Sequence, residues 1–204
     1  MKSTAVQCFI ACKRGPVGAA RRVGQNASAP PLPGGVAHVV SELASAVDAH
    51  WVASAENQIE RDALARWPKG VEVDPDGLPP FRLSLVDHQS DVIRAAQDRL
   101  FSNILWRALH AVWDDIEEPA FGPEDARSWV AFRQFTRDVV DRLSSASFSA
   151  LNPVYLLQDF QMACVPPLLR KTRPDARQAL LLHCAWPSLT DWSKLPRTWR
   201  RDLA

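Results

Sequence analysis

The sequence predicts an α/β fold: a Rossmann-like, mainly parallel sheet with helices on both faces. Two observations predict it. Short strand-like segments alternate with segments of helical periodicity along the 204 residues. The strand-like segments are also continuously apolar, which is typical of parallel strands that are buried on both faces.

The first part of the chain predicts a strand, a loop and a helix. Residues 5–11 form a short apolar run that is followed by Lys13 and Arg14. This pattern predicts a buried strand with a basic loop at its carboxyl end. Residues 15–35 are rich in Gly and Pro and predict a loop. Apolar residues spaced by three and four over 36–47 then predict an amphipathic helix.

A second strand and a hairpin follow. Residues 51–54 form a compact apolar run, which predicts a strand. Residues 71–73 and 81–86 flank the turn sequence Asp-Pro-Asp-Gly at 74–77, so they are expected to pair as a hairpin.

Helices and buried strands alternate through the second part of the chain. Helical spacing predicts two long helices, and Leu-rich runs that stop at polar residues predict two strands. The expected helices are 98–113, 124–145, 162–171 and 189–195, and the expected strands are 154–157 and 179–182.

Composition narrows the class of protein. Hydrophobic residues make up 47% and charged residues 23%, which is ordinary globular usage. The formal net charge of +1 provides no basic field, so we expect no nucleic-acid partner. No apolar stretch approaches the roughly 18 residues of a membrane span, so we expect no membrane partner. The four Cys indicate no disulfide framework, so we expect a reducing, cytoplasmic location.

The chemistry of a metal or a protein nucleophile is not indicated. The four Cys show neither a Cys-x-x-Cys pair nor a His at zinc-ligand spacing, so we expect no metal and no cofactor. A serine-nucleophile motif is absent, and a single candidate carboxylate does not make a glycosidase.

Polar residues stand where three predicted strands end, and parallel sheets bind ligands at that edge. Arg14 could clamp a phosphate or carboxylate, or be a solvated surface arginine. Asp159 could accept hydrogen bonds from sugar hydroxyls, or cap the next helix. His183 could donate to a developing negative charge, or be a packed core histidine.

Two further features complete the candidate site. Gly34 and Gly35 at a helix start would let backbone N–H groups approach an anion, although the pattern lacks a phosphate-loop or dinucleotide motif. Trp106 lies on a predicted helix, where its ring could pack in the core or stack against a sugar ring.

At these positions the sequence resembles the N-terminal half of the trehalose-6-phosphate synthase family, retaining glycosyltransferases built from two facing Rossmann-like domains. The resemblance implies that the chain forms the N-terminal half of a GT-B architecture. Blocks similar to the family's S-N-R, G-G, F-S-N-S-I-L-W, V-W-V-H-D-Y-H, L-L-R, F-H-I-P-F-P and L-P occur in the family's order. They are Cys12 to Arg14, Pro33 to Gly35, Phe101 to Trp106, Val154 to Gln161, Leu169-Arg170, Leu182 to Pro187 and Leu195-Pro196.

Within the family the chain resembles the pseudo-glycosyltransferase branch, typified by validoxylamine A 7'-phosphate synthase. Lys13 stands where trehalose enzymes have Asn. Gln158 and Gln161 replace the family's His positions around Asp159, a departure from both branches. Other blocks similar to this branch are Pro33 to Gly35 with Val39-Val40, Trp51 to Ala55, Phe121-Gly122 and Phe135 to Asp138.

The resemblance implies roles for individual residues. Arg14 would contact the phosphate of a sugar phosphate or cyclitol phosphate acceptor, and Asp159 its hydroxyl groups. Trp106 would help to shape the acceptor pocket. His183 would lie near the transferred ring, which makes Asp159 and His183 the candidate catalytic residues. Gly34 and Gly35 would lie on the side of the nucleotide-activated sugar or cyclitol donor.

The resemblance also implies that the family's acceptor-site Tyr falls near Gln97. The family mechanism uses no protein nucleophile, and catalysis comes from positioning and charge stabilisation.

The family's second, nucleotide-binding domain has no counterpart in residues 1–204, which we expect to form one acceptor-side domain. This domain would be inactive without the second one, which a separate chain could supply. The alternative is a non-catalytic sugar-phosphate-binding or regulatory subunit.

Overall fold

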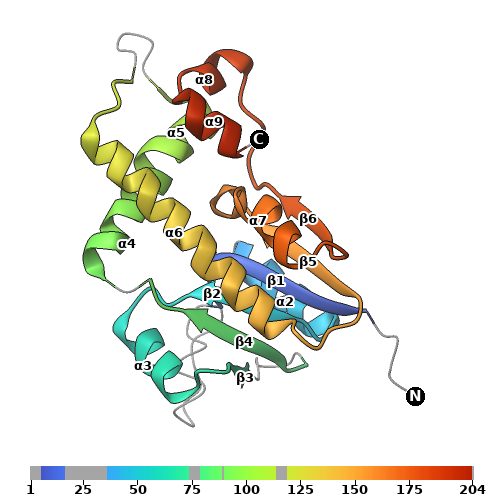
Figure 1. Ribbon diagram of the computed structural model, residues 1–204. Coiled ribbons are helices and arrows are strands. Elements are labelled where there is room, and N and C mark those ends of the chain that lie inside the picture. The colour runs from blue at the N-terminus through green and yellow to red at the C-terminus, as the bar shows by residue number, and fades with distance from the viewer. Residues whose placement is uncertain (1–5, 17–35, 74–78, 89, 114–118, 204) are drawn as a thin grey trace.

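The computed structural model describes residues 6–16, 36–73, 79–88, 90–113 and 119–203 (Figure 1). A six-stranded sheet forms its centre, with the strands in the order β3-β4-β2-β1-β5-β6. The strands are β1 Gln7–Arg14, β2 His50–Ser54, β3 Val71–Val73, β4 Phe81–Val86, β5 Pro153–Gln158 and β6 Arg177–Leu181.

Five of the six strands run parallel, and only the edge strand β3 pairs antiparallel, with β4. The order in which the chain adds strands therefore reverses between β1 and β5, because β2 and β4 lie on one side of β1 while β5 and β6 lie on the other. This is the Rossmann strand order. The predicted parallel sheet and the predicted hairpin are both confirmed.

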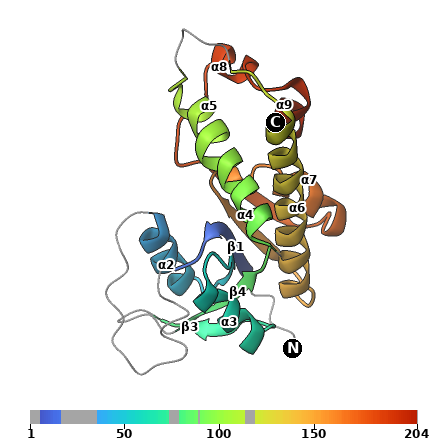
Figure 2. The same ribbon diagram turned by 90° about the vertical axis from the view of Figure 1, so that its left-hand side faces the viewer.

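Helices cover both faces of the sheet. Figure 2 shows α2 and α6 on opposite sides of it. In Figure 1, α8 and α9 lie beyond the sheet, near α5. The helices are α2 Val36–Ala46, α3 Gln58–Arg66, α4 Asp91–Asp98, η1 Arg99–Leu105, α5 Trp106–His110, α6 Pro123–Ala146, η2 Phe160–Met162, α7 Val165–Thr172, α8 Leu189–Ser193 and α9 Arg197–Leu203.

Each face of the sheet has its own core. On the α6 side, Phe9, Val52 and Tyr155 pack against aromatic residues of η1 and α6. On the α2 side, Trp51 and Phe81 pack with their ring centroids 5.8 Å apart. The alternation follows from the strand period of two, since Val52 and Trp51 are consecutive in β2.

The long helix α6 follows the predicted pattern closely. Pro123 begins it, and the Gly122 N–H donates to Asp125 Oδ2 at 2.9 Å, which satisfies one backbone donor near the start of the helix. Its predicted apolar face is buried, as the spacing required. That face is Trp129, Phe132, Phe135, Val139, Val140 and Leu143.

The helix predicted over 98–113 has a different local geometry. Its first part, η1, is π-helical, and α5 continues it as far as His110, where Ala111 adopts a left-handed conformation with φ 53°. The predicted apolar positions are buried except Val112, which follows the end of the helix and is exposed.

Other differences concern burial and short helices. The strand β6 is an edge strand and is largely exposed, although its Leu-rich run predicted a buried strand. Val39 and Val47 are exposed in the helix predicted over 36–47, where Val40 and Ala44 face the sheet instead. The helices α3 and α9 were not predicted.

No helix in the described ranges is both long enough and apolar enough to cross a bilayer. The four cysteines are free, and within the same ranges no three His, Cys, Asp or Glu side chains gather as metal ligands would.

Candidate functional site

The carboxyl ends of β1 and β5 lie side by side where the strand order of the sheet reverses, and open α/β sheets bind ligands at such a point. Register pairs Ala11 with Leu157, which brings the end of β1 next to Gln158 and Asp159. Gln158 in turn pairs with Leu181, two residues before His183. The three polar strand ends predicted from the sequence therefore meet at one edge.

Lys13 is fully engaged within the protein. Its Nζ lies 2.9 Å from Glu56 Oε2, 2.9 Å from Asp98 Oδ1 and 5.6 Å from the centre of the Phe101 ring. Only 12% of its side chain is exposed. This ammonium joins the end of β1 to the residues after β2 and to α4, so it has little capacity left for a ligand.

Arg14, the next residue, has the opposite surroundings. It lies beyond a register shift in β1, opposite Ser54 of β2, and is exposed. Among the described residues it forms no hydrogen bond and no ion pair. Its guanidinium is therefore available for an anion, whereas its neighbour Lys13 is not.

Asp159 has an unusual backbone. Its φ of 71° and ψ of 171° fall in a region that is almost restricted to glycine, and such strain clusters at functional sites. Three hydrogen bonds hold it: its N–H donates to the Leu181 carbonyl at 2.7 Å, its carboxylate accepts from the Phe160 N–H at 2.9 Å, and its carbonyl accepts from the Met162 N–H at 3.0 Å. The predicted capping role is present, and the backbone strain exceeds what a cap requires.

Burial and the charge of Asp159 raise the pKa of two cysteine thiols. Burial raises the pKa of Cys12, and the Asp159 carboxylate raises it further. The pKa of Cys184 is raised by the same two causes in the same order. Both thiols therefore stay protonated at neutral pH, which makes them poor nucleophiles.

His183 is exposed and bonded to Gln158, so it is not a packed core histidine. Its Nε2 lies 3.0 Å from Gln158 Oε1, and Gln158 itself is buried. Because that oxygen only accepts, Nε2 is the donor in this hydrogen bond. Gln158, which stands at a His position of the family, thus orients the histidine.

Trp106 lies at the start of α5 with 44% of its surface exposed, so it is not a core residue. Its ring stacks on His110, with centroids 4.4 Å apart and planes inclined by 23°. No contact in the described residues joins Trp106 to Arg14 or Asp159.

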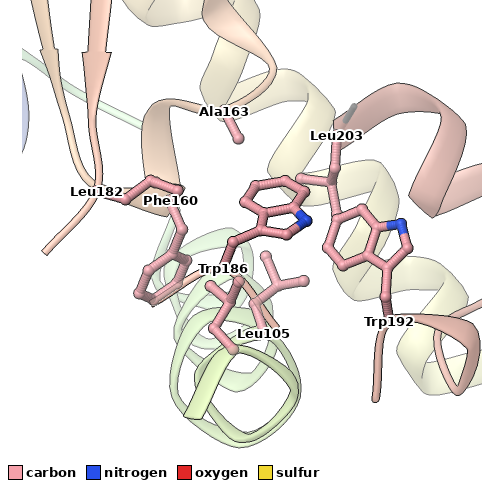
Figure 3. Close-up of a pocket in the computed structure, with 8 residues that line it drawn as sticks. Leu105, Phe160, Ala163, Leu182, Trp186, Trp192 and Leu203 are labelled. Atoms are coloured by element: carbon pink, nitrogen blue, oxygen red, sulfur yellow. The ribbon is translucent and has the colours of Figure 1, made fainter. Parts of the chain in front are cut away.

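A small apolar pocket links the elements that carry Trp106, Asp159 and His183. Its walls include a direct neighbour of each of them: Leu105, Phe160 and Leu182 (Figure 3). At about 20 Å³ it has room for little more than one water molecule, so it is a packing junction and not a sugar site.

Gly34 and Gly35, which were expected on the donor side, lie outside the described residues. Gln97, near which the family's acceptor-site Tyr was expected, is buried and donates to the Ala131 carbonyl at 3.3 Å. Its side chain therefore joins α4 to α6.

Sequence reasoning missed the partners of Lys13. Glu56 follows β2 directly, so its position after a strand was a usable signal. Asp98 and Phe101 belong to a helical segment, and no local pattern connects them with Lys13.

Known proteins share the sequence pattern and the fold of this chain. Residues 9–203 match the model of glycosyltransferase family 20. Validamine 7-phosphate valienyltransferase of Streptomyces hygroscopicus subsp. jinggangensis is 37% identical over 171 residues, which is 84% of this chain and 34% of that protein. Trehalose-6-phosphate synthase of Mycobacterium avium is 26% identical over 155 residues, covering 71% of this chain and 28% of that protein.

A solved trehalose-6-phosphate structure from E. coli, bound with UDP-2-fluoro glucose, superposes with a TM-score of 0.59 at 18% identity, over 93% of this chain and 36% of that chain. The chain thus spans about a third of the length of these relatives. With its sheet order and a family match over nearly all of its residues, the chain belongs to glycosyltransferase family 20.

Proposed function

We propose that this chain forms the acceptor side of a glycosyl-transfer or pseudo-glycosyl-transfer site. The acceptor would be a sugar phosphate or a cyclitol phosphate, bound at the carboxyl ends of β1 and β5. The observation that carries the proposal is the pair of neighbouring cations: Lys13 is locked by two carboxylates, while Arg14 is exposed and unpaired among the described residues.

Arg14 would bind the acceptor phosphate. A guanidinium presents a planar fork of donors that matches two phosphate oxygens. Its position where the strand order of the sheet reverses is the one that ligands of such folds occupy.

Asp159 and His183 would act on the reacting groups. The strained backbone of Asp159 fixes its carboxylate near the ends of β5 and β6, where it would accept hydrogen bonds from acceptor hydroxyls. His183, held by Gln158, would lie near the transferred ring. Neither forms a covalent intermediate in this proposal, so they accelerate the reaction by positioning and by stabilising charge.

The remaining roles rest on the family resemblance. Gly34 and Gly35 would face a nucleotide-activated sugar or cyclitol donor, which agrees with the UDP-2-fluoro glucose of the E. coli neighbour. Trp106 would help to shape the acceptor pocket. Transfer would also require the part of the relatives that lies beyond the matched third, supplied by another chain or by a longer form of this one. We place the reaction in the cytoplasm.

Calorimetric titration tests the acceptor site. Glucose 6-phosphate and a cyclitol phosphate are titrated into the protein and into the variants Arg14→Ala and Lys13→Met. Losing a charge-assisted phosphate contact costs ~1.5–3 kcal/mol, so Arg14→Ala should weaken binding about tenfold or more.

A matched control is Arg137→Ala, which removes an exposed arginine of α6 that bonds to Gln134. It should leave the affinity unchanged. Absence of binding by both phosphates, or equal affinities of the wild type and Arg14→Ala, would refute the acceptor-site assignment.

A second candidate function is a sugar-phosphate-binding subunit without catalysis. The replacement of the family's His positions by Gln158 and Gln161 favours it. An assay of transfer distinguishes the two functions. The chain is mixed with the C-terminal portion of a relative, a nucleotide-activated donor and the sugar phosphate. Transfer to the sugar phosphate supports the first function, and binding of the sugar phosphate without transfer supports the second.

A further inference from the structure

A second group of basic side chains lies at the amino-terminal edge of the sheet, opposite the candidate acceptor site. His50 begins β2 and pairs in register with Arg82 of β4. The strands are parallel, so the two side chains point to the same face. That face is the one under α6, because the His50 ring lies 5.9 Å from the ring of Phe9, a residue of the α6-side core.

Helix α6 adds a third basic residue over this pair. Its carboxyl-terminal half, which contacts β2 and β4, carries the half-buried Arg142. The Arg142 Nε and Nη2 atoms are buried and have no hydrogen-bond partner. A buried guanidinium that leaves two of its nitrogens unsatisfied is rare in native proteins and calls for an occupant.

Acidic side chains near this group do not neutralise it. Asp138, one turn earlier on α6, bonds to His88 and Gln134. Glu72 pairs in register with Arg82 from the edge strand β3, but both are exposed. Asp141 is exposed as well. Within the described ranges, neither Arg82 nor Arg142 forms an ion pair.

His50 is affected by both arginines. Burial, followed by the charges of Arg82 and Arg142, lowers its pKa to about 4. Its Nε2 lies 2.7 Å from Ser84 Oγ, and its Nδ1 has no hydrogen-bond partner among the described residues. The region therefore combines two positive charges, a neutral imidazole and unused donors.

We propose that Arg82, Arg142 and His50 form a binding site for a tetrahedral oxyanion, either inorganic phosphate or the phosphate group of a small phosphomonoester. Two guanidinium groups would donate to its oxygens, as charge-assisted hydrogen bonds require. The site does not depend on the proposed function, because it lies at the opposite ends of the strands from Arg14 and Asp159.

Thermal unfolding tests the site with inorganic phosphate as the probe, at constant ionic strength set with sodium chloride. Phosphate should raise the melting temperature of the wild type and of Arg14→Ala alike. Arg142→Gln should weaken the apparent phosphate affinity about tenfold, since it removes a charged donor. Arg127→Gln, an exposed position on the same helix, should leave that affinity unchanged.

A second variant guards against a folding defect in Arg142→Gln. Arg82→Gln changes an exposed strand residue and should weaken the phosphate response in the same direction. Glycerol phosphate serves as the phosphomonoester: an equal response supports a phosphomonoester ligand, and a response to inorganic phosphate alone supports the free anion.

Three outcomes would overturn the proposal. These are a phosphate response that is absent in the wild type, one that persists unchanged in both Arg142→Gln and Arg82→Gln, and one that Arg14→Ala abolishes. The last outcome would assign the anion to the acceptor site and leave the proposed function intact.

Discussion

The Lys13 ammonium and the Asp98 carboxylate lie 2.9 Å apart, joining the end of the central strand β1 to helix α4. The same ammonium contacts Glu56 at 2.9 Å. One cation thus pairs with two carboxylates beside the candidate acceptor site, and the adjacent Arg14 carries the available positive charge.

Replacing Lys13 should destabilise the protein more than replacing Arg14. In Lys13→Met, two carboxylates face each other without a cation, which should lower the free energy of unfolding by ~1–2 kcal/mol. The cost stays moderate because 29% of the Glu56 side chain and 58% of the Asp98 side chain remain exposed to water. Urea unfolding measures the change.

Arg14→Ala is the internal comparison, with an expected change within about 0.5 kcal/mol, as for other exposed positions. If Glu56→Gln added to Lys13→Met without any coupling in a double-mutant cycle, the ion pair would not be the cause.

Removing the backbone strain at Asp159 should separate stability from binding. Asp159→Gly relaxes a conformation that favours glycine and loses little capping energy, so the free energy of unfolding should stay level or rise by ~0.5–1 kcal/mol. Acceptor binding should fall, because the carboxylate is gone. Urea unfolding and calorimetry measure the two effects.

Asp159→Ala removes the same carboxylate but keeps the strain, so it should be less stable than Asp159→Gly by at least ~1 kcal/mol. Equal stabilities of the two variants would show that the φ of 71° does not store strain.

Local patterns in the sequence predicted the strand ends but not what surrounds them. Asp159 was placed after β5 because its apolar run stops at Gln158, and the structure agrees. Glu56 and Asp98 could not be assigned to Lys13, because these contacts depend on how distant elements pack. The strained φ of Asp159 also leaves no mark on the amino-acid sequence.

The exposure of strand β6 and the existence of the short helix α3 were harder to predict, for two physical reasons. A Leu-rich run has the same appearance in a central strand and in an edge strand, so the exposure of Leu181 was missed. Helix α3 has mostly polar residues, and its N-cap, the Asn57 side chain that accepts from the Glu60 N–H, is its clearest signal. Among its described side chains only Ala63 is buried, so its apolar spacing gives a weak signal.

The unsatisfied guanidinium of Arg142 predicts an unusual stability effect. Arg142→Met replaces two buried donors without partners by an apolar chain of similar length. In phosphate-free buffer the free energy of unfolding should therefore stay level or rise, because replacing uncompensated buried polar groups by apolar ones is neutral or stabilising. Chemical unfolding of both proteins checks this, and a loss above ~1 kcal/mol would mean that Arg142 has a stabilising partner.

Acid should destabilise the protein through His50. Its pKa is about 4 in the folded state and about 6.5 when unfolded, so between these values the unfolded chain binds the extra proton. Stability is therefore full above pH 6.5 and falls as the pH drops toward 4, by ~2 kcal/mol at pH 5 from this group alone.

His50→Gln lacks the titrating ring while retaining a side chain able to bond Ser84, so its unfolding free energy should depend less on pH. Urea unfolding of both proteins at pH 7 and pH 5 isolates the contribution, because all other groups titrate equally in the two. Parallel pH profiles would mean that His50 is protonated as easily in the fold as in the unfolded chain, and that the positive charges of Arg82 and Arg142 do not reach it.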